Sequence, residues 1–394
     1  MIDDIVIVSA VRTPVGRFGG SLKNLNSGYL GAIVIEEAIR RINLSSELID
    51  EVILGEVRQT TESSNVARVA ALRAGIPEKT PAFTVNRLCA SGMQAVTSAV
   101  QQISFGQAEI VVAGGTESLS RAPIYLRNSR FGEGAPTLVD SNLENGQQPI
   151  ELYGKDLGMG ITAENVAERY SVSREVQDEF AYNSQQKAAK AIERGSFKEE
   201  IIPVVIQERK KVFQVTEDEH PRPATSLEGL AKLKAVFKAG GSVTAGNSCG
   251  RNDGAAAMVI MKGSKAKELG LKPLARIVDW ATAGVSPKEM GIGPVPAIEK
   301  LLARTNLTLS EVGLIELNEA FAAQALAVIR ETGLDSHKVN VNGGAIALGH
   351  PLGATGCKIM ITLLYEMKRR QEQYGMATLC VGGGQGMAVM LQLL

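Results

Sequence analysis

The sequence predicts an α/β fold in which a mostly parallel sheet is covered by helices on both faces. Three observations lead to this prediction. Short β-branched runs alternate with Ala-rich helical stretches, in the order that βαβ units have. The same order returns in the C-terminal part of the chain, after a long stretch of different character. The composition is rich in Ala, Val, Ile and Gly and poor in aromatic residues, as in ordinary globular α/β proteins.

In the N-terminal part, predicted strands and helices follow one another closely. The helix expected at 91–104 has the clearest periodicity, because Met93, Val96, Val100 and Ile103 fall on one face at helical spacing. The remaining elements are helices at 28–41 and 65–74 and strands at 5–11, 51–55, 82–86 and 110–114.

The C-terminal part repeats this order. Strands are expected at 274–277, 314–317, 338–342 and 376–381, and helices at 294–304, 319–332 and 355–369. Two local likenesses connect the parts: TVN at 84–86 resembles NVN at 340–342, and IVVAGG at 110–115 resembles ATLCVGG at 377–383. We interpret them as signs of an internal duplication, although chance similarity between two α/β parts stays open as the alternative.

The stretch between the two parts differs from both of them in composition and in its predicted elements. It contains a Gly/Asn/Pro-rich segment at 127–149, a helix at 162–193 and a charged segment at 208–223. A long excursion between compact halves is typical of a functional lid or a binding loop. We therefore divide the chain into an N-terminal half (1–119 and 247–270), a loop domain (120–246) and a C-terminal half (271–394).

Composition excludes several function classes. Lysines and arginines number 42, the same as aspartates and glutamates, which argues against a nucleic-acid partner. No apolar run is long enough to span a bilayer, and the start of the chain shows no signal or transit pattern, so we expect a cytoplasmic protein without a membrane partner. The four cysteines lie far apart and form no C-x-x-C pair, so neither a metal site nor a disulfide framework is expected.

Two residues are candidates for covalent chemistry. Cys89 follows a strand and opens a helix, where unpaired N–H groups and the helix dipole lower the pKa of a thiol and can hold an oxyanion. His350 lies in a glycine-rich loop before another helix, and cysteine nucleophiles usually need an imidazole neighbour. This loop lacks the Gly-Lys-Ser/Thr of a phosphate loop. The alternatives are a buried apolar cysteine and a structural histidine.

Two further candidates end predicted strands. Cys380 precedes three glycines, whose bare amides can face a ligand or form a plain turn. Asn318 could cap the helix that follows it, or its amide could order a water. With Cys89 and His350, these residues lie at the carboxyl ends of predicted parallel strands, where open α/β sheets bind ligands.

Taken jointly, these segments resemble the thiolase family, and the match covers nearly the whole chain. Eight segments carry the resemblance in order and spacing. They are SAVRTP at 9–14, CASG at 89–92, GGTES at 114–118, VTAGN at 243–247, NDGAA at 252–256, NEAF at 318–321, GHP at 349–351 and CVGGG at 380–384.

The resemblance implies a fold of five layers (α-β-α-β-α), built from two duplicated βαβαβ-type halves with an inserted loop domain that binds coenzyme A. It implies reversible cleavage of 3-ketoacyl-CoA by coenzyme A, or condensation of two acetyl-CoA to acetoacetyl-CoA, as part of fatty acid metabolism. Coenzyme A would be a substrate, with no tightly bound cofactor and no metal. A homodimer, or a homotetramer assembled through the loop domain, is expected.

The resemblance also assigns roles to the candidates. Cys89 would attack the keto carbon, His350 would take the thiol proton, and Cys380 would protonate the acetyl-CoA enolate. One oxyanion site would be formed by His350 with a water held by Asn318, and the other by the amides of Cys89 and Gly382.

Further residues of the site follow from the same resemblance. Met159 and Phe321 would shape the acyl pocket, and Arg222 would bind the nucleotide end of coenzyme A, unless it is simply a solvated charge. Ser248 and Cys249 stand where the family commonly has Ala-Ser, so the contact with pantetheine is weakened there or is taken over by Ser248. No histidine precedes Met159, and residues 127–157 depart from the biosynthetic pattern, which puts short-chain-only specificity in doubt.

The sequence disfavours two rival functions. A decarboxylating ketoacyl synthase of the same fold would have a histidine in place of Asn318 and no second active cysteine. A non-catalytic lipid-binding relative would be expected to lose the set of Cys89, His350 and Cys380, which is complete in this sequence.

Overall fold

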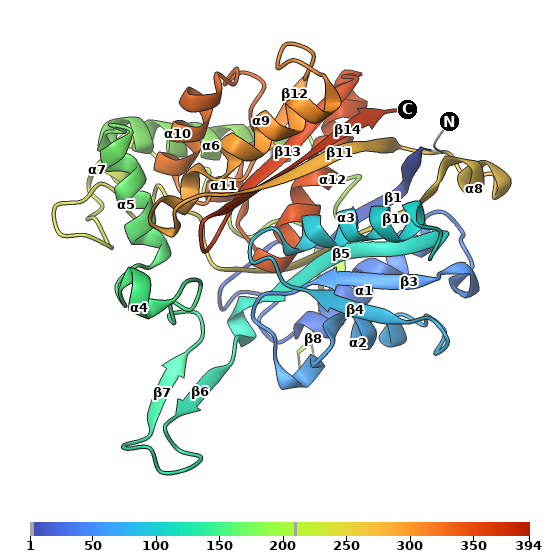
Figure 1. Ribbon diagram of the computed structural model, residues 1–394, viewed down its shortest axis with the longest axis horizontal. Coiled ribbons are helices and arrows are strands. Elements are labelled where there is room, and N and C mark those ends of the chain that lie inside the picture. Colours follow the sequence, from blue (N-terminus) through green and yellow to red (C-terminus); the bar gives the residue numbers. More distant parts are fainter. Residues whose placement is uncertain (1–3, 209–210) are drawn as a thin grey trace.

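The computed structural model describes residues 4–208 and 211–394, and most of its strands form one ten-stranded mixed sheet (Figure 1). In spatial order the strands are β12 (Leu314–Leu317), β13 (Tyr374–Val381), β14 (Gln385–Leu393), β11 (Ala275–Gly284), β1 (Ile5–Arg12), β10 (Asn252–Lys262), β5 (Ile110–Ser118), β3 (Glu51–Gly55) and β4 (Ala82–Val85), with β2 (Gly16–Arg17) beside β10. The strands predicted at 51–55 and 314–317 have the predicted bounds.

The expectation of a mostly parallel sheet is wrong. Only β12–β13, β3–β4 and β3–β5 pair in parallel, and the five pairings in the middle of the sheet are antiparallel. The cause lies in two strands that the sequence did not indicate, β10 and β14. Strand β14 returns directly from β13 through the glycines at 382–384, and a connection this short permits only antiparallel pairing.

The two halves of the sheet repeat one spatial order. In the N-terminal half it is β1-β10-β5-β3-β4, and in the C-terminal half β11-β14-β13-β12. The fifth place of the second half is taken by residues near Val339, which forms an isolated parallel bridge to Ile315. The predicted strand at 338–342 is therefore wrong, because the backbone at Asn340 turns to φ +46° and its side chain bonds to Leu317.

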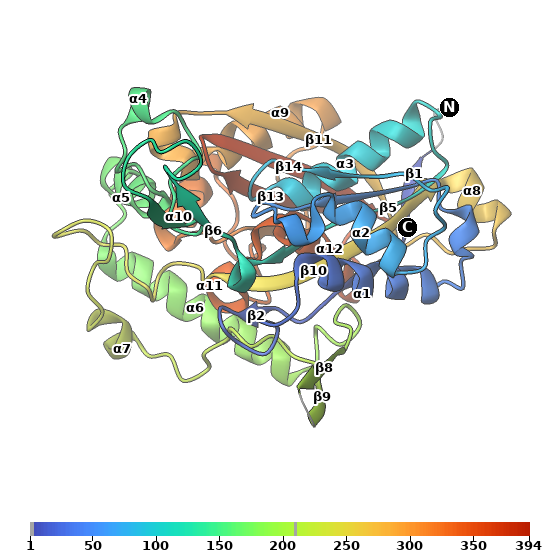
Figure 2. The same ribbon diagram turned by 90° about the horizontal axis from the view of Figure 1, so that it is seen from below.

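Helices complete a layered α-β-α-β-α arrangement (Figures 1 and 2). Helices α1 (Ser27–Arg40) and α2 (Val66–Arg73) pack on the N-terminal half, and α9 (Pro294–Thr305) and α10 (Ala322–Thr332) belong to the C-terminal half. Between the two halves lie α3 (Ser91–Ser104) and α12 (Leu352–Arg370). The short helices α8 (Gly263–Glu268) and α11 (Ala345–Leu348) lie in connections.

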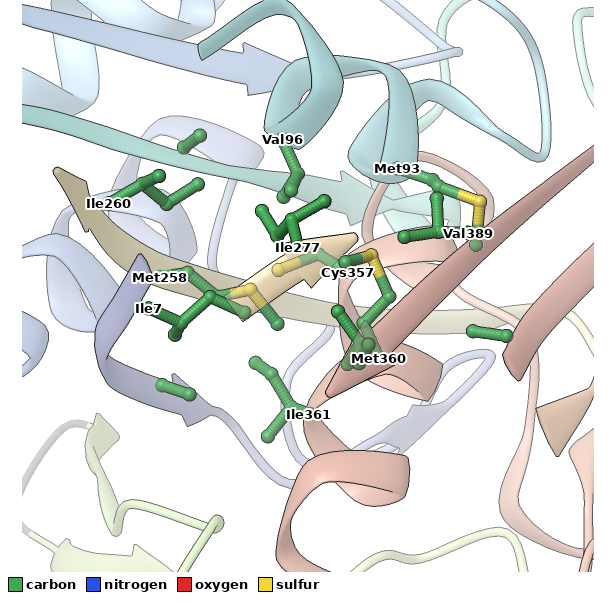
Figure 3. Close-up of a cluster of buried hydrophobic side chains, with 14 of the residues drawn as sticks. Ile7, Met93, Val96, Met258, Ile260, Ile277, Cys357, Met360, Ile361 and Val389 are labelled. Atoms are coloured by element: carbon green, nitrogen blue, oxygen red, sulfur yellow. The ribbon is translucent and has the colours of Figure 1, made fainter. Parts of the chain in front are cut away.

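The central layer is a dense apolar core. Figure 3 shows Met93 and Val96 of α3 facing Cys357 and Met360 of α12, with side chains of the central strands around them. Glycines bring the two helices close together: a methyl group on Gly356 would lie 2.5 Å from the Met93 backbone nitrogen. The two loops that enter these helices are thereby held next to each other.

The inserted segment lies along one side of the molecule and also forms a projecting hairpin (Figures 1 and 2). It contains β6 (Ile124–Arg127), β7 (Thr137–Asp140), α4 (Ile150–Tyr153), α5 (Met159–Arg169), α6 (Arg174–Glu193), β8 (Val204–Glu208), β9 (Lys211–Val215) and α7 (Leu227–Ala231). The single helix predicted at 162–193 is wrong. Ser171 has φ +50°, which interrupts it, and Ser173 caps the second helix by accepting from the Val176 N–H. Residues 209–210 of the predicted charged segment lie outside the described residues.

A buried ion-pair cluster ties this segment to β1. The guanidinium of Arg12 contacts Glu200 at 2.7 Å and both carboxylate oxygens of Asp218 at 2.7 and 2.9 Å. All three side chains are buried, so these contacts offset the cost of removing the charges from water. The inserted segment is thus fixed to the core at both of these carboxylates.

Candidate active site

Cys89 lies in a tight turn between β4 and α3. The turn requires a left-handed backbone at Leu88, where φ is +45°. Ser91 stabilises this turn through two hydrogen bonds. Its hydroxyl accepts from the Arg87 N–H at 2.9 Å and donates to the Leu88 carbonyl at 2.6 Å. Cys89 is partly buried directly before the first turn of α3, as its position after a strand predicted.

The protonation state of Cys89 differs from the expectation. Burial raises the pKa of its thiol to about 11, although the backbone N–H of Gly382, that of Cys89 itself and the charge of Arg58 act in the opposite direction. The predicted lowering by the helix terminus is therefore outweighed. The resting thiol is protonated at neutral pH and needs a base before it can act as a nucleophile.

His350 has the properties of such a base. Burial and then the charge of Lys358 lower the pKa of His350 to about 3, so the ring is neutral. Its Nδ1 lies 2.7 Å from the hydroxyl of Thr355, which itself donates to the Pro351 carbonyl. Because that hydroxyl hydrogen is already used, Nδ1 carries the ring proton and Nε2 keeps its lone pair. The His350 backbone N–H donates to Asn252, which fixes the loop.

Asn318 lies beside this lone pair. Its amide nitrogen is 3.5 Å from His350 Nε2, and its side-chain oxygen is buried without a hydrogen-bond partner among the described residues. Helix α10 begins only at Ala322, with Phe321 as the capping residue, so the helix-cap interpretation of Asn318 is wrong. The amide is instead directed to the histidine.

Cys380 and Cys249 join Cys89 in one cluster. Cys380 is fully buried near the end of β13, and burial raises its pKa well above the ordinary value, with further contributions from Cys89 and Cys249. Burial and then Cys89 raise the pKa of Cys249 to about 12. Cys357 lies apart, in the core between α3 and α12. Three of the four thiols thus share one site.

Apolar and small residues close one side of this site. Met159, Phe321 and Cys380 belong to one apolar cluster. A methyl group on Gly382 would lie 3.0 Å from Leu88 Cδ1, 3.2 Å from Gln147 Cγ and 3.6 Å from Met159 Sδ. Only a glycine fits there without displacing these side chains, and its N–H remains free to face Cys89.

Arg222, Ser248 and Cys249 line a common groove of about 490 Å³. The hydroxyl of Ser248 donates to the Thr244 carbonyl at 2.7 Å, so it can offer only a lone pair to a ligand. His220 also lines the groove. Burial and the neighbouring Arg222 lower the pKa of His220 to about 4, so this ring too is neutral.

Two family models match the chain. Residues 5–264 match the model described as the thiolase N-terminal domain, and residues 271–393 match the thiolase C-terminal domain. This chain belongs to the thiolase family. As a thiolase it is an acyltransferase, and coenzyme A is its substrate rather than a tightly bound cofactor. In the described part of this thiolase no group of three or more potential ligand side chains could hold a metal ion.

Known thiolases resemble the chain over its full length. The acetyl-CoA acetyltransferase of Syntrophomonas wolfei is 50% identical over 400 residues, covering 100% of both chains. The crystal structure of the Bacillus anthracis acetyl-CoA acetyltransferase superposes with a TM-score of 0.96 at 48% identity, covering 100% of this chain and 99% of that one. The crystal structure of human mitochondrial 3-ketoacyl-CoA thiolase superposes with a TM-score of 0.95 at 43% identity, and 100% of both chains is covered.

The sequence did not single out several residues that support this thiolase site. Thr355 and Asn252 orient His350. Asn252 stood in the quoted NDGAA motif and Thr355 at the start of a predicted helix, but their partners could not be inferred from the sequence. Glu117 accepts from the backbone N–H groups of Val57, Arg58 and Gly353, and so links the end of β5 to the loop of His350. Gln147 carried no signal beyond lying in the stretch that departs from the family pattern.

Two buried carboxyl groups accompany the thiolase site. Burial raises the pKa of Glu117 to about 7, although its three backbone donors act against this. Burial and the neighbouring Glu117 raise the pKa of Glu56 to about 8. Both carboxyl oxygens of Glu56 are buried, and a contact with the Ser27 side chain acts against the rise of its pKa. The charge of Glu117 also contributes to the raised pKa of the Cys89 thiol.

Proposed function

We propose that this thiolase transfers acetyl and longer acyl groups between thioesters of coenzyme A. It cleaves 3-ketoacyl-CoA with coenzyme A and, in reverse, condenses two acetyl-CoA to acetoacetyl-CoA. The observation that carries the proposal is the neutral His350, whose Nε2 lone pair faces the amide of Asn318, in a site that also holds the cluster of Cys89, Cys249 and Cys380. The names of the relatives from Syntrophomonas wolfei and Bacillus anthracis agree with it.

Cleavage begins with the thiol of Cys89. His350 Nε2 accepts the thiol proton while the sulfur attacks the keto carbon. Because the pKa values of the two groups lie far apart, about 11 against about 3, the resting site holds no thiolate–imidazolium pair. Proton transfer therefore accompanies the attack, as in general base catalysis. The N–H groups of Cys89 and Gly382 stabilise the developing oxyanion.

Carbon–carbon cleavage then releases the enolate of acetyl-CoA. Asn318 and His350 lie where the enolate oxygen can be stabilised, and Cys380 supplies the proton to its carbon. A thiol with a raised pKa suits both directions, because it remains a proton donor at neutral pH and is a strong base once deprotonated. The thiol of coenzyme A finally gives its proton to the Cys380 thiolate and attacks the acyl-Cys89 thioester. The bond between the acyl carbon and the Cys89 sulfur breaks, and this sulfur takes back its proton from His350.

The groove lined by Arg222, Ser248 and Cys249 supports a site for coenzyme A. Arg222 would contact the nucleotide end, since a guanidinium suits phosphate groups and stacks on adenine. Cys249 would lie along the pantetheine arm, where a thiol is a poorer hydrogen-bond partner than a hydroxyl. Met159 and Phe321 would bound the acyl group.

Two variants test the roles of the thiols. Cys89→Ala should abolish both acetoacetyl-CoA cleavage and the mass increase of the intact protein on incubation with acetyl-CoA. Cys380→Ser should still be acetylated at Cys89 but should fail to exchange the methyl protons of acetyl-CoA with deuterated water. Full activity of Cys89→Ala, or unimpaired exchange by Cys380→Ser, would reject these roles and reopen the rivals with a different catalytic set.

We also propose a homodimer or homotetramer, a cytoplasmic location and a three-part division at residues 119/120, 246/247 and 270/271. The division is supported by the topology, since β1, β3, β4, β5 and β10 belong to one half of the sheet. No helix in the described ranges is long and apolar enough to cross a membrane.

A further inference from the structure

A polar cavity of about 460 Å³ lies beside the Cys89 turn. It shares no lining residue with the groove of Arg222 and Cys249. Its lining consists of Val57, Arg58, Gln59, Asn86, Leu88, Tyr125, Arg127, Ser141, Glu144, Gly146 and Gln147. Only Val57 and Leu88 among these are aliphatic. A plain alkyl chain placed here would cover polar groups without giving them partners, which is unfavourable.

The cavity adjoins the acyl side of the site. Asn86 and Leu88 belong to the turn that carries Cys89. Gln147 packs over the glycine loop: its carbonyl oxygen would be 2.6 Å from a methyl group on Gly383, and its side chain lies next to Gly382. Since the Gly382 N–H faces the Cys89 sulfur, an acyl chain on Cys89 that extends past Leu88 and Gln147 enters this cavity.

The lining carries a net positive charge. It contains two arginines and one glutamate, which gives +2 − 1 = +1. Arg127 pairs with Glu144 at 2.8 Å, so these two charges compensate each other. The excess charge therefore belongs to Arg58.

The guanidinium of Arg58 has no ion-pair partner among the described residues. Its Nε–H is buried and donates to no acceptor in that part of the chain. Glu117, whose carboxyl group is within range of the Arg58 charge, uses its oxygens for three backbone N–H groups, one of them the N–H of Arg58 itself. Arg58 itself lines the cavity, so a ligand that supplies a carboxylate there can form a charge-assisted hydrogen bond with its unpaired guanidinium.

We infer that this cavity is an acyl subsite for chains that end in a carboxylate. The substrate class is a 3-oxoacyl-CoA with an ω-carboxylate, and Arg58 is the residue that pairs with this carboxylate. The inference rests on the proposed function, because it requires that the acyl group be carried by Cys89.

The test compares two matched series of substrates. One series consists of 3-oxoacyl-CoA thioesters of six, eight and ten carbons that end in a methyl group, and the other has a carboxylate at that end. For at least one length, kcat/KM for thiolysis should be at least about 10-fold higher with the carboxylate, because a site that hydrogen-bonds a polar group discriminates strongly against its absence. This measurement requires no variant.

Variants then assign the preference to Arg58. Arg58→Leu should lower the ratio of carboxylate to methyl kcat/KM at least about 10-fold, and Arg58→Lys should retain part of it. Arg130→Leu is the matched control, since Arg130 is exposed in the β6–β7 hairpin outside the cavity. It should leave the ratio unchanged.

Two outcomes would overturn the assignment. One is a preference of the unaltered enzyme for the methyl series at every length, and the other is an unchanged ratio in Arg58→Leu. Acetoacetyl-CoA, whose acyl chain is too short to reach the cavity, separates this result from failure of the proposed function. If the enzyme cleaves acetoacetyl-CoA but shows no preference for the carboxylate among the longer substrates, only the subsite is rejected. If it is not cleaved, both proposals are rejected.

Discussion

At the residue scale, burial acts on Cys89 and His350 in opposite directions. It disfavours the charged form of each group, so it raises the pKa of the thiol and lowers the pKa of the imidazole. Both groups are consequently neutral at rest. The same burial makes their hydrogen-bond partners decisive, because Thr355 determines which ring nitrogen of His350 carries the proton.

Alkylation measures the protonation state of Cys89. With iodoacetamide, labelling of Cys89 in the free enzyme should accelerate about 10-fold per pH unit from pH 7 to 10, because only the thiolate reacts and its pKa is about 11. Cys357, which is fully buried, should be labelled last. Peptide mass spectrometry at timed intervals gives both rates. A plateau below pH 8, or labelling of Cys249 or Cys357 before Cys89, would contradict this picture.

The two buried carboxyl groups make stability depend on pH. The folded-state pKa values of about 8 for Glu56 and about 7 for Glu117 lie above the ordinary 4.5, so folding favours their protonated forms. Their contribution is complete below about pH 4.5 and is lost as the pH rises through 7 and 8. The free energy of unfolding in urea should therefore fall between pH 5 and 8, and Glu56→Gln should make this fall shallower.

Glu36→Gln, at an exposed site, is the control and should leave the pH dependence of stability unchanged. An equal slope in Glu56→Gln and the unaltered protein would contradict the assignment.

At the scale of elements, the crossing of α3 and α12 positions the site. Cys89 precedes α3 and His350 precedes α12, and the two helices hold equivalent places in the duplicated halves. Glycines at the crossing allow backbone to approach backbone, as where a methyl group on Gly92 would lie 2.8 Å from the Gly353 carbonyl oxygen. The separation of the catalytic loops thus depends on residues that carry no functional group.

Gly356→Ala tests this dependence. The added methyl group would lie 2.5 Å from the Met93 nitrogen, and backbone cannot move aside cheaply. We expect the free energy of unfolding to fall by about 1–3 kcal/mol and kcat to fall as the loops separate. Urea unfolding and acetoacetyl-CoA cleavage measure the two effects. In the control Gly146→Ala the methyl group meets open space, so stability should change by less than about 0.5 kcal/mol. Unaltered stability of Gly356→Ala would show that the helices can separate without cost.

At the scale of the whole molecule, the β6–β7 hairpin gathers several exposed apolar side chains. It projects from the body at the bottom of Figure 1. Leu126 and Leu138 lie directly opposite each other on its two strands and are 55% and 76% exposed. Ile124 and Phe131 extend the patch. Exposed apolar surface of this kind typically marks a protein interface, which supports the proposed assembly through the inserted segment.

Charges on this hairpin should reduce the size of the assembly. The double variant Leu126→Glu with Leu138→Glu places like charges opposite each other on paired strands, where they repel. It also places charges in the proposed interface, where their burial is costly. Light scattering after size exclusion should give a smaller mass than for the unaltered enzyme, while acetoacetyl-CoA cleavage persists. Phe105→Glu, at an 83% exposed position remote from the hairpin, is the control. An unchanged mass in the double variant would remove the hairpin from the assembly contacts.

The sequence by itself determined the strongly periodic elements, such as the helix at 91–104, and singled out Cys89, Asn318, His350 and Cys380 as candidates. These depend on local spacing and on motifs that can be read along the chain. Contacts between distant residues were decided only by the tertiary structure. Asn252 bonds to His350 from 98 positions away, and β10 and β14 take places in the middle of the sheet that no local pattern specified. Burial settled the protonation of Cys89 in the same way, because desolvation is the sum of all the segments packed around a group and outweighed the local effect of its helix.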